Sequence, residues 1–279
     1  MKIGCIIQAR MGSSRLPNKV LMKFPYDGEK SNLQWIIERA NKTKKIDQII
    51  LATTLDSVDD PIEKLATKNG IVCFRGDVNN VLSRYYLAAK ENSLDVIVRI
   101  TGDCPCIDPM VIDEVIRGFL KADNDYCSNT LCRSYPHGLD VEVFSFVALR
   151  QAFHSATEEF EKEHVTPYIY KTKKEFFNIS QVVAKEDYSN IRVTLDTYED
   201  YMAICALYQQ FPEGNFGLYD LIDLYETCPW LSFINNAVTQ KKQFDSLRQE
   251  LFEVYRFAKK QDLIRAASFI EGEISDLES

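Results

Sequence analysis

Three cations lie in a short loop near the start of the chain, together with a glycine and two serines. The loop follows an apolar run, Ile3 to Ile7, that predicts a buried first strand. Such groups suit a polyanion, and open α/β folds bind phosphates where a strand runs into a loop of this kind. No acidic residue precedes Asp27, although the formal net charge of the chain is -8. The cations are Arg10, Arg15 and Lys19, and the small residues are Gly12, Ser13 and Ser14.

The glycine patterns of two common phosphate sites are absent from this loop. It contains neither GxxxxGK[ST] nor GxGxxG, so it is neither a Walker A loop nor a dinucleotide-binding fingerprint. A solvated basic loop without a ligand therefore stays open as a second interpretation.

Two aspartates follow predicted strands, and each precedes a predicted helix. Asp103 comes after the apolar run 95–100, and Asp196 comes after the run 191–195. Open α/β sheets place their ligands at the carboxyl ends of strands. Mg²⁺ needs few protein carboxylates, because phosphate oxygens and water fill its other positions. The two aspartates are therefore a candidate Mg²⁺ site.

Helix capping is the alternative role for both aspartates. Asp108 stands closer to the next predicted helix and is the better cap, which leaves Asp103 available for a ligand. Asp196 or Thr197 could cap the helix that follows, with Asp200 at the capping-box position. For Asp196 the residues alone do not decide between a cap and a metal ligand.

Strands and helices alternate through the first half of the chain. The predicted strands are 3–7, 48–54, 71–74 and 95–100, and the ranges with helical spacing are 33–40, 59–70, 78–89 and 112–119. This alternation predicts an α/β fold, with a mostly parallel, Rossmann-like sheet covered by helices on both faces.

The pattern becomes mixed after about Asp123. It predicts strands at 125–129, 140–144 and 191–195, and helices at 146–156, 161–171 and 204–211. Two helical stripes, from Phe244 to Ala258 and from Leu263 to Ile274, predict C-terminal helices. We therefore expect an α/β domain over residues 1–235 and a helical extension over 236–279.

The loop segment IIQARMGSSRLPNKVL resembles the nucleotide-binding signature of the CMP-sugar synthetases, a group of nucleotidyltransferases. It is most similar to the branch named after spore coat polysaccharide biosynthesis protein F. Further similar segments are RITGDCP, RVTLDTYED, FRGDVNNVLSRYY, YPHGLDVEVFS and EKEHVTPYI, which occur over roughly the first 240 residues. The chain departs from the usual pattern at Asn18, where the family has glycine, although asparagine tolerates a left-handed backbone better than most residues.

The resemblance implies an enzyme that transfers CMP from CTP to a sugar or sugar-acid acceptor and releases pyrophosphate, in surface polysaccharide or glycan biosynthesis. It implies that Mg²⁺ is held by Asp103 and Asp196, and that Arg10, Arg15, Lys19 and Asp103 are catalytic. The nucleotide-binding set that it implies is Ala9, Arg10, Met11, Gly12, Ser13, Ser14, Arg15, Lys19, Arg75, Ser83 and Asp103. Asp140 and Glu142, which share one face of a predicted strand, and His164 are the acceptor-binding candidates.

Composition excludes several classes of protein. A pI near 5.1 argues against a nucleic-acid-binding protein, and no apolar stretch is long enough to span a membrane, so we expect a cytoplasmic protein. The eight cysteines form no CxxC pair, which argues against zinc. A redox role for Cys104 and Cys106 is left open, as is a homodimer formed through the C-terminal helices.

Two other functions are compatible with these residues. A glycosyltransferase also binds a nucleotide and a metal on such a sheet, but three loop cations suit a triphosphate better than a diphosphate donor. A non-catalytic nucleotide-binding protein is the other alternative, and the presence of both Asp103 and Asp196 argues against it.

Overall fold

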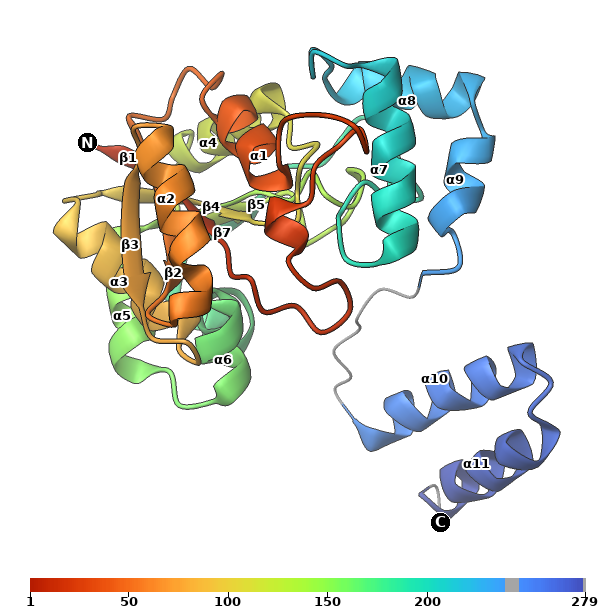
Figure 1. The fold of residues 1–279 in the computed structure, drawn as a ribbon. Helices are drawn as coiled ribbons and strands as arrows, with labels where there is room; N and C mark the ends of the chain where they lie inside the picture. Colours follow the sequence, from red (N-terminus) through yellow and green to blue (C-terminus); the bar gives the residue numbers. More distant parts are fainter. Residues whose placement is uncertain (239–245, 278–279) are drawn as a thin grey trace. The chain divides into compact units, whose positions relative to one another are not determined.

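The computed structural model describes residues 1–238 and 246–277. The chain divides into two compact units, with the division after Val238, and each is described here by itself (Figure 1). The sequence predicts a domain boundary after residue 235. This boundary stays a prediction, because the compactness of the two units does not show that either of them folds alone.

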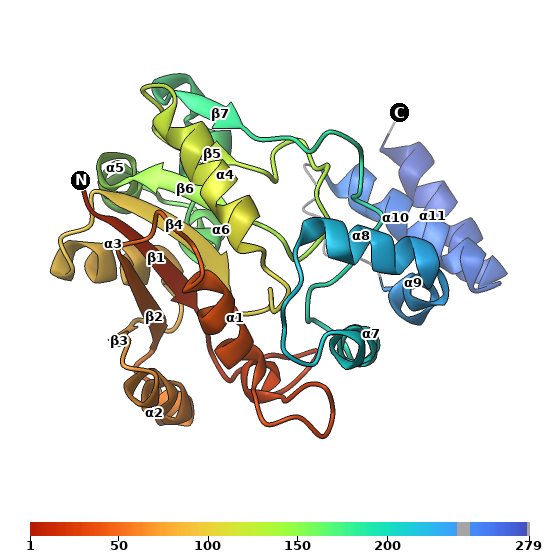
Figure 2. The same ribbon diagram turned by 90° about the horizontal axis from the view of Figure 1, so that it is seen from above.

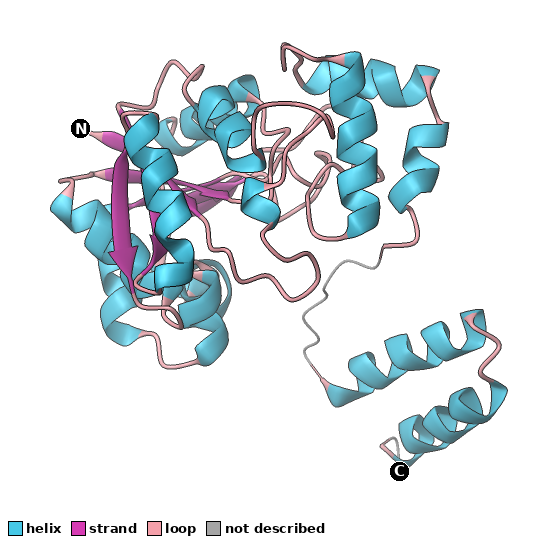
Figure 3. Ribbon diagram, in the orientation of Figure 1, coloured by secondary structure: helices cyan, strands magenta, loops and turns pink. Residues whose placement is uncertain are grey.

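The first unit is built on one sheet, which contains seven strands in the described residues (Figure 3). Their order across the sheet is β3-β2-β1-β4-β6-β5-β7. The bounds are β1 Ile3–Gln8, β2 Gln48–Thr54, β3 Val72–Gly76, β4 Val96–Thr101, β5 Tyr126–Ser128, β6 Glu142–Ser145 and β7 Ile179–Gln181.

The first four strands pair in parallel, and the inner three, β1, β2 and β4, are mostly buried because helices cover both faces of the sheet. Strand β6 runs antiparallel to both of its neighbours, β4 and β5, and β5 pairs in parallel with β7. The expected mostly parallel, mixed α/β sheet is confirmed.

Helices pack on both faces of the sheet (Figure 2). One face is covered by α1 (Asn32–Ala40), α2 (Asp60–Lys68), α4 (Pro109–Leu120), α7 (Tyr198–Gln210) and α8 (Leu218–Thr227). The other face is covered by α3 (Val81–Glu91) and α5 (Phe146–Ser155), with the chain around Ile169. Two short helices, α6 (Glu159–His164) and α9 (Trp230–Asn235), complete the unit.

Three predicted elements differ from the structure. Residues 191–195 form no sheet strand; Arg192 makes only an isolated bridge with His137. The helix predicted over 161–171 is broken at Val165, whose φ of 73° is incompatible with a helix, and a separate turn follows at Tyr168–Thr172. The strand predicted from Asp140 begins at Glu142.

The second unit contains the C-terminal helices that the spacing predicts, α10 (Leu247–Lys260) and α11 (Ile264–Asp276). The expected start of the first stripe, Phe244, lies outside the described residues. Neither these helices nor any other among residues 1–238 and 246–277 combine the length and the apolar character needed to cross a membrane.

Candidate active site

The basic loop connects β1 to a single 3₁₀ turn at Lys19–Leu21. Leu16 is fully buried and anchors the loop, and the amide of Met11 donates to Asp59 Oδ1 at 2.7 Å. Asn18 has a φ of 58°, so this asparagine adopts the left-handed conformation expected where the related signature has glycine. Lys19 follows immediately, so the turn at Asn18 determines where its side chain begins.

Most of the remaining loop is open to solvent. Arg10, Gly12 and Ser14 are exposed, and a Cβ at position 12 would meet no atom within 4 Å. Gly12 therefore leaves space above the backbone, as close approach of a ligand would require. Ala9 is buried beside β2, and Ser13 Oγ accepts a hydrogen bond from Leu16.

Asp103 follows the end of β4, next to the end of β1. Gly102 permits this proximity, since a Cβ there would lie 2.8 Å from the main-chain oxygen of Gln8. The Thr101 hydroxyl and, at 3.6 Å, the Cys104 thiol donate to Asp103 Oδ1. Asp103 is therefore oriented by its own turn, while Oδ2 remains directed to Lys19.

Asp196 lies beside Asp103 because the two residues that precede it, Thr194 and Leu195, form hydrogen bonds with Asp103. The amide of Leu195 and the hydroxyl of Thr194 donate to the carbonyl oxygen of Asp103, at 2.8 and 3.1 Å. These bonds replace the sheet pairing that the sequence predicted for residues 191–195. They place the two aspartates side by side, although Asp196 is remote from Asp103 in the chain.

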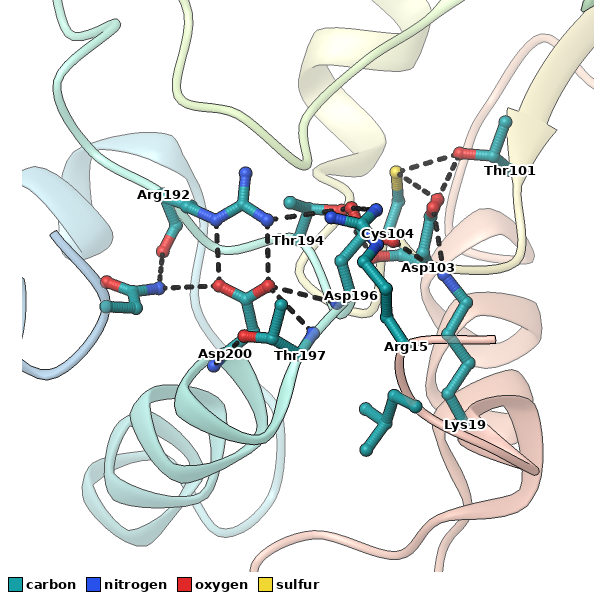
Figure 4. Close-up of polar contacts among 12 residues, drawn as sticks. Arg15, Lys19, Thr101, Asp103, Cys104, Arg192, Thr194, Asp196, Thr197 and Asp200 are labelled. Carbon is teal, nitrogen blue, oxygen red and sulfur yellow. Dashed lines mark hydrogen bonds and ion pairs between the residues drawn. The ribbon is translucent and has the colours of Figure 1, made fainter. Parts of the chain in front are cut away.

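Both carboxylates converge on Lys19 (Figure 4). Lys19 Nζ lies 3.2 Å from Asp103 Oδ2 and 2.8 Å from Asp196 Oδ1. Arg15 Nη2 lies 3.2 Å from Asp196 Oδ2. The structure thus brings together four of the residues singled out from the sequence.

The electrostatics of this cluster favour the ionised forms of Lys19 and Asp103 over their neutral forms. Burial would lower the pKa of Lys19, but the charges of Asp103 and Asp196 outweigh it and raise the pKa above the ordinary value. Burial would likewise raise the pKa of Asp103, but Lys19 and the hydrogen bond from Thr101 hold it below its usual range. The Lys19 ammonium and the Asp103 carboxylate therefore stay ionised at neutral pH.

A buried ion pair lies next to Asp196 and fixes its position. The sequence does not predict this pair. Arg192 forms two 2.8 Å hydrogen bonds with Asp200, which is fully buried, and also lies 3.5 Å from Asp196. Asp200 Oδ2 accepts the amides of Asp196 and Thr197, as the predicted capping box requires, and Asn235 donates to Oδ1. Asp200 therefore fills the capping role, and the Asp196 carboxylate faces the loop cations.

The carboxylate pair fits a divalent cation whose other ligands come from a nucleotide. No group of three or more His, Cys, Asp or Glu side chains in the described part of the chain could hold a metal by itself. Two carboxylates with phosphate oxygens and water are a usual Mg²⁺ environment. The Lys19 ammonium shows that this position already holds a cation in the free protein.

The two candidates for the nucleoside lie away from the carboxylate pair. Arg75 donates to the carbonyl oxygens of Thr54 and Asp56 and pairs with two acidic side chains of α2. Ser83 Oγ donates to the carbonyl oxygen of Asn80 within the first turn of α3. Both side chains are already engaged within the protein, so a ligand role for either stays a prediction.

The acceptor candidates do not form one cluster. Asp140 makes a two-bond ion pair with Arg133, at 2.6 and 3.0 Å. Glu142 is buried and binds Arg99, Tyr126 and Thr166. The strand begins only at Glu142, and the two carboxylates have separate partners, so a joint role of Asp140 and Glu142 in acceptor binding stays a prediction.

His164 and the two cysteines of the RITGDCP region contribute little to the cluster. His164 is exposed at the end of α6, and its carbonyl oxygen accepts the amide of Thr166. Cys104 and Cys106 are buried, and burial raises the pKa of each thiol, of Cys106 to about 12. Protonated, buried thiols are poor nucleophiles, which argues against a redox role.

Comparisons with known proteins agree with this geometry. A family described as "Cytidylyltransferase" matches residues 4–260. An uncharacterized protein of Methanocaldococcus jannaschii is 41% identical over 244 residues, which are 86% of this chain and 97% of that protein. The spore coat polysaccharide biosynthesis protein SpsF of Bacillus subtilis is 34% identical over 75% of this chain and 87% of its own length. The solved structure of a cytidylyltransferase from Leptospira borgpetersenii has a TM-score of 0.80 and 34% identity, covering 86% of this chain and all of that one.

Proposed function

Because this chain belongs to the cytidylyltransferase family, we propose that it transfers CMP from CTP to a sugar or sugar-acid acceptor and releases pyrophosphate. The similarity to a protein named for spore coat polysaccharide biosynthesis supports a place in glycan assembly. CTP is a cytoplasmic metabolite, so the reaction belongs in the cytoplasm. The observation that carries the proposal is the convergence of Asp103 and Asp196 on Lys19 beside an open basic loop.

In this reaction the protein mainly positions the substrates and neutralises the charge of the phosphates. An acceptor hydroxyl releases its proton to water while its oxygen attacks the α-phosphorus, the bond from that phosphorus to the bridging oxygen breaks, and pyrophosphate leaves with the electron pair. Arg10, Arg15 and Lys19 bind the triphosphate and neutralise the charge that grows on the leaving pyrophosphate. Loop amides near Gly12 bind the same phosphates without adding charge.

Asp103 and Asp196 would hold Mg²⁺ against the phosphates. The metal, when bound, would polarise the α-phosphate and lower the pKa of an acceptor hydroxyl. The ammonium of Lys19, which shields the two carboxylates in the free protein, becomes available to the phosphates. The Arg192–Asp200 pair keeps Asp196 in position throughout.

The acceptor is expected at the β4–β6 side of the site. Asp140 and Arg133 lie there as a partly exposed ion pair. Burial, together with the charges of Asp103 and Asp140, raises the pKa of the Cys104 thiol, which is next to Asp103 in the chain. This pair offers both a donor and an acceptor to the hydroxyl and carboxylate groups of a sugar acid. Glu142 would act indirectly, by fixing Arg99.

A binding panel tests the proposal directly. We would measure thermal unfolding with CTP, UTP, ATP, GTP and dTTP, each with and without Mg²⁺, followed by pyrophosphate release with sugar acids. A ligand that binds the native state raises the melting temperature by mass action. A CTP-selective shift enhanced by Mg²⁺ is the expected result. A larger response to nucleotide sugars than to any triphosphate would overturn the proposal.

A further inference from the structure

Asp59 is a buried aspartate whose carboxylate binds the basic loop instead of the helix that follows it. It is 1% exposed and occupies the N-cap position of α2, yet its side chain makes no capping hydrogen bond to α2, a helix that the structure describes in full. An aspartate at an N-cap ordinarily accepts an amide from the first turn. Oδ1 of Asp59 accepts the amide of Met11 at 2.7 Å, and Oδ2 accepts the hydroxyl of Thr54. The carboxylate therefore joins the end of β2 to the basic loop.

Asp108 shows how a structural aspartate is arranged in the same protein. It is 3% exposed and caps α4, because its Oδ1 atom accepts the amide of Met110 in the first turn of that helix at 2.7 Å. Its Oδ2 atom accepts the amide of Leu218 at 2.6 Å, which joins α4 to α8. Asp59 and Asp108 thus have the same burial and the same number of donors, but the partners of Asp108 belong to two helices and not to the loop.

Met11 links Asp59 to the rest of the basic loop. Its amide is bound by Asp59, and its carbonyl oxygen accepts the amide of Asn18 at 3.3 Å. The two ends of the loop are therefore joined at Met11, with residues 12–17 between them. Asn18 immediately precedes Lys19, whose ammonium lies between the two carboxylates of the site. A displacement of Met11 would move both the loop amides and the start of the Lys19 side chain.

The turn that carries Asp59 is held by Arg75. The Nε and Nη2 atoms of Arg75 donate to the carbonyl oxygens of Thr54 and Asp56, at 2.8 and 2.7 Å. Its Nη1 atom lies 2.7 Å from Oδ1 of Asp60, the first residue of α2. One guanidinium thus bonds to the beginning, the middle and the end of the turn. Asp59 therefore has a defined position from which to hold the loop.

We propose that Asp59 is a positioning residue for the phosphate-binding loop, and that it sets the positions of the loop amides and of Lys19 by binding the amide of Met11. This inference rests on the proposed function and extends it to a residue outside the loop. Both oxygen atoms of Asp59 are already bonded, and a carboxylate repels phosphates, so Asp59 acts through Met11 and not by contact with the nucleotide. Binding groups lose much of their effect when they are displaced by even 1 Å, as a general rule.

The variant Asp59→Ala tests the inference, since it removes the acceptor of the Met11 amide. We expect the affinity for inorganic triphosphate, measured by calorimetry in the presence of Mg²⁺, to fall about tenfold. The affinity for CMP should fall much less, because CMP lacks the two outer phosphates. An equal loss of affinity for both ligands would overturn the inference.

Asp108→Ala is the matched control. It also removes a buried carboxylate with two hydrogen bonds, so the melting temperature should fall in both variants. The affinity of Asp108→Ala for inorganic triphosphate, measured well below its melting temperature, should equal that of the wild type. If both variants lose the same triphosphate affinity, the loss reflects general destabilisation and Asp59 does not position the loop.

Asp59→Asn separates the hydrogen bond from the charge. Its Oδ1 atom can still accept the amide of Met11, and its Nδ2 atom can donate to the hydroxyl of Thr54. The triphosphate affinity should therefore stay within about threefold of the wild type. A loss as large as that of Asp59→Ala would show that the charge matters and not the bond to Met11, and would overturn the inference.

A double variant tests whether Asp59 acts through the loop. In the Lys19→Met background, Asp59→Ala should cost less triphosphate affinity than in the wild type, because one group that Asp59 positions is gone. Equal losses in the two backgrounds would contradict the inference. Failure of the wild type to bind CTP would overturn the proposed function as well, whereas equally tight CTP binding by the wild type and Asp59→Ala would overturn this inference alone.

A measurement on the free wild type requires no variant. Hydrogen exchange of single amides, followed by NMR, should show a Met11 amide that exchanges more slowly than the amide of the exposed Gly12. Equally fast exchange of both amides would show that Asp59 does not hold Met11 in solution.

Discussion

The amide of Leu195 donates to the main-chain oxygen of Asp103 at 2.8 Å, and this contact joins the two segments that carry the candidate metal ligands. Because the bond is between main-chain atoms, it is kept when the side chain of Asp103 or Asp196 is replaced. Substitution of an aspartate should therefore change the chemistry of the site more than its shape.

Asp103→Asn should abolish most of the turnover while the fold persists. The amide keeps the size of the side chain but loses the charge that would hold a divalent cation and that pairs with Lys19. We expect kcat to fall about 10²- to 10³-fold, measured as pyrophosphate release. Asp223→Asn, on the exposed side of α8, is the control. Activity within about threefold of the wild type would remove Asp103 from the site.

Lys19→Met should weaken triphosphate binding more than monophosphate binding. The ammonium is placed to neutralise phosphates remote from the nucleoside, so the affinity for CTP should fall by about tenfold or more and that for CMP much less. Equal losses for CTP and CMP would contradict this placement.

The same variant should also change the response of the free protein to divalent cations. Without Lys19, the carboxylates of Asp103 and Asp196 lack the cation that lies between them. The melting temperature should fall, and Mg²⁺ alone should restore more of it than it adds to the wild type. An equal Mg²⁺ response in both proteins would argue against a metal at this pair.

Asp200→Asn should destabilise the first unit by about 3 kcal/mol, because the buried Arg192 guanidinium would lose the nearer of its two charged partners, Asp200 and Asp196. Urea unfolding followed by tryptophan fluorescence would measure this change. Glu38→Gln, which breaks the exposed pair with Lys30, should cost less than about 1 kcal/mol. A similar small effect of Asp200→Asn would show that Asp200 does not support the site.

His137 should make the stability depend on pH below neutrality. Burial, together with the charge of Arg133, lowers its pKa from 6.5 to about 4. Between these pH values the unfolded chain binds more protons at this position than the native protein, so stability falls as the pH falls from about 6.5 toward 4. After allowance for partial solvent access, we expect about 1–2 kcal/mol.

The comparison with His137→Gln isolates this contribution. The variant should lose less stability than the wild type over the same pH interval, measured by urea unfolding at each pH. If the free energy of unfolding falls equally with pH in the two proteins, the pKa of His137 is not lowered in the native protein.

The parts of the site that are local in sequence could be predicted. The basic loop after β1 and Asp103 after β4 each depend on a strand end and a few neighbouring residues, which the hydrophobic pattern marks clearly. The left-handed backbone at Asn18 was also predictable, because few residue types tolerate it.

The parts that depend on distant partners could not be predicted. An apolar run at 191–195 looks like a strand, but Thr194 and Leu195 bond to the turn at Asp103 and not to a neighbouring strand. The alternating pattern predicts that Asp140 and Glu142 lie on one face of a strand. The partners of Glu142 come from three other segments of the chain and are Arg99, Tyr126 and Thr166. No local pattern specifies such partners, because tertiary contacts override it.

The last helix of the first unit has a consequence for synthesis of the protein. Lys19 and Asp196 are 177 residues apart in the chain, and Asn235 of α9 still contributes a hydrogen bond to Asp200. A ribosome-bound chain can form the loop and the first four strands long before these contacts exist. We therefore expect the nascent chain to be inactive toward CTP until nearly the whole first unit has emerged, so that the phosphate loop never acts without the carboxylate that completes it.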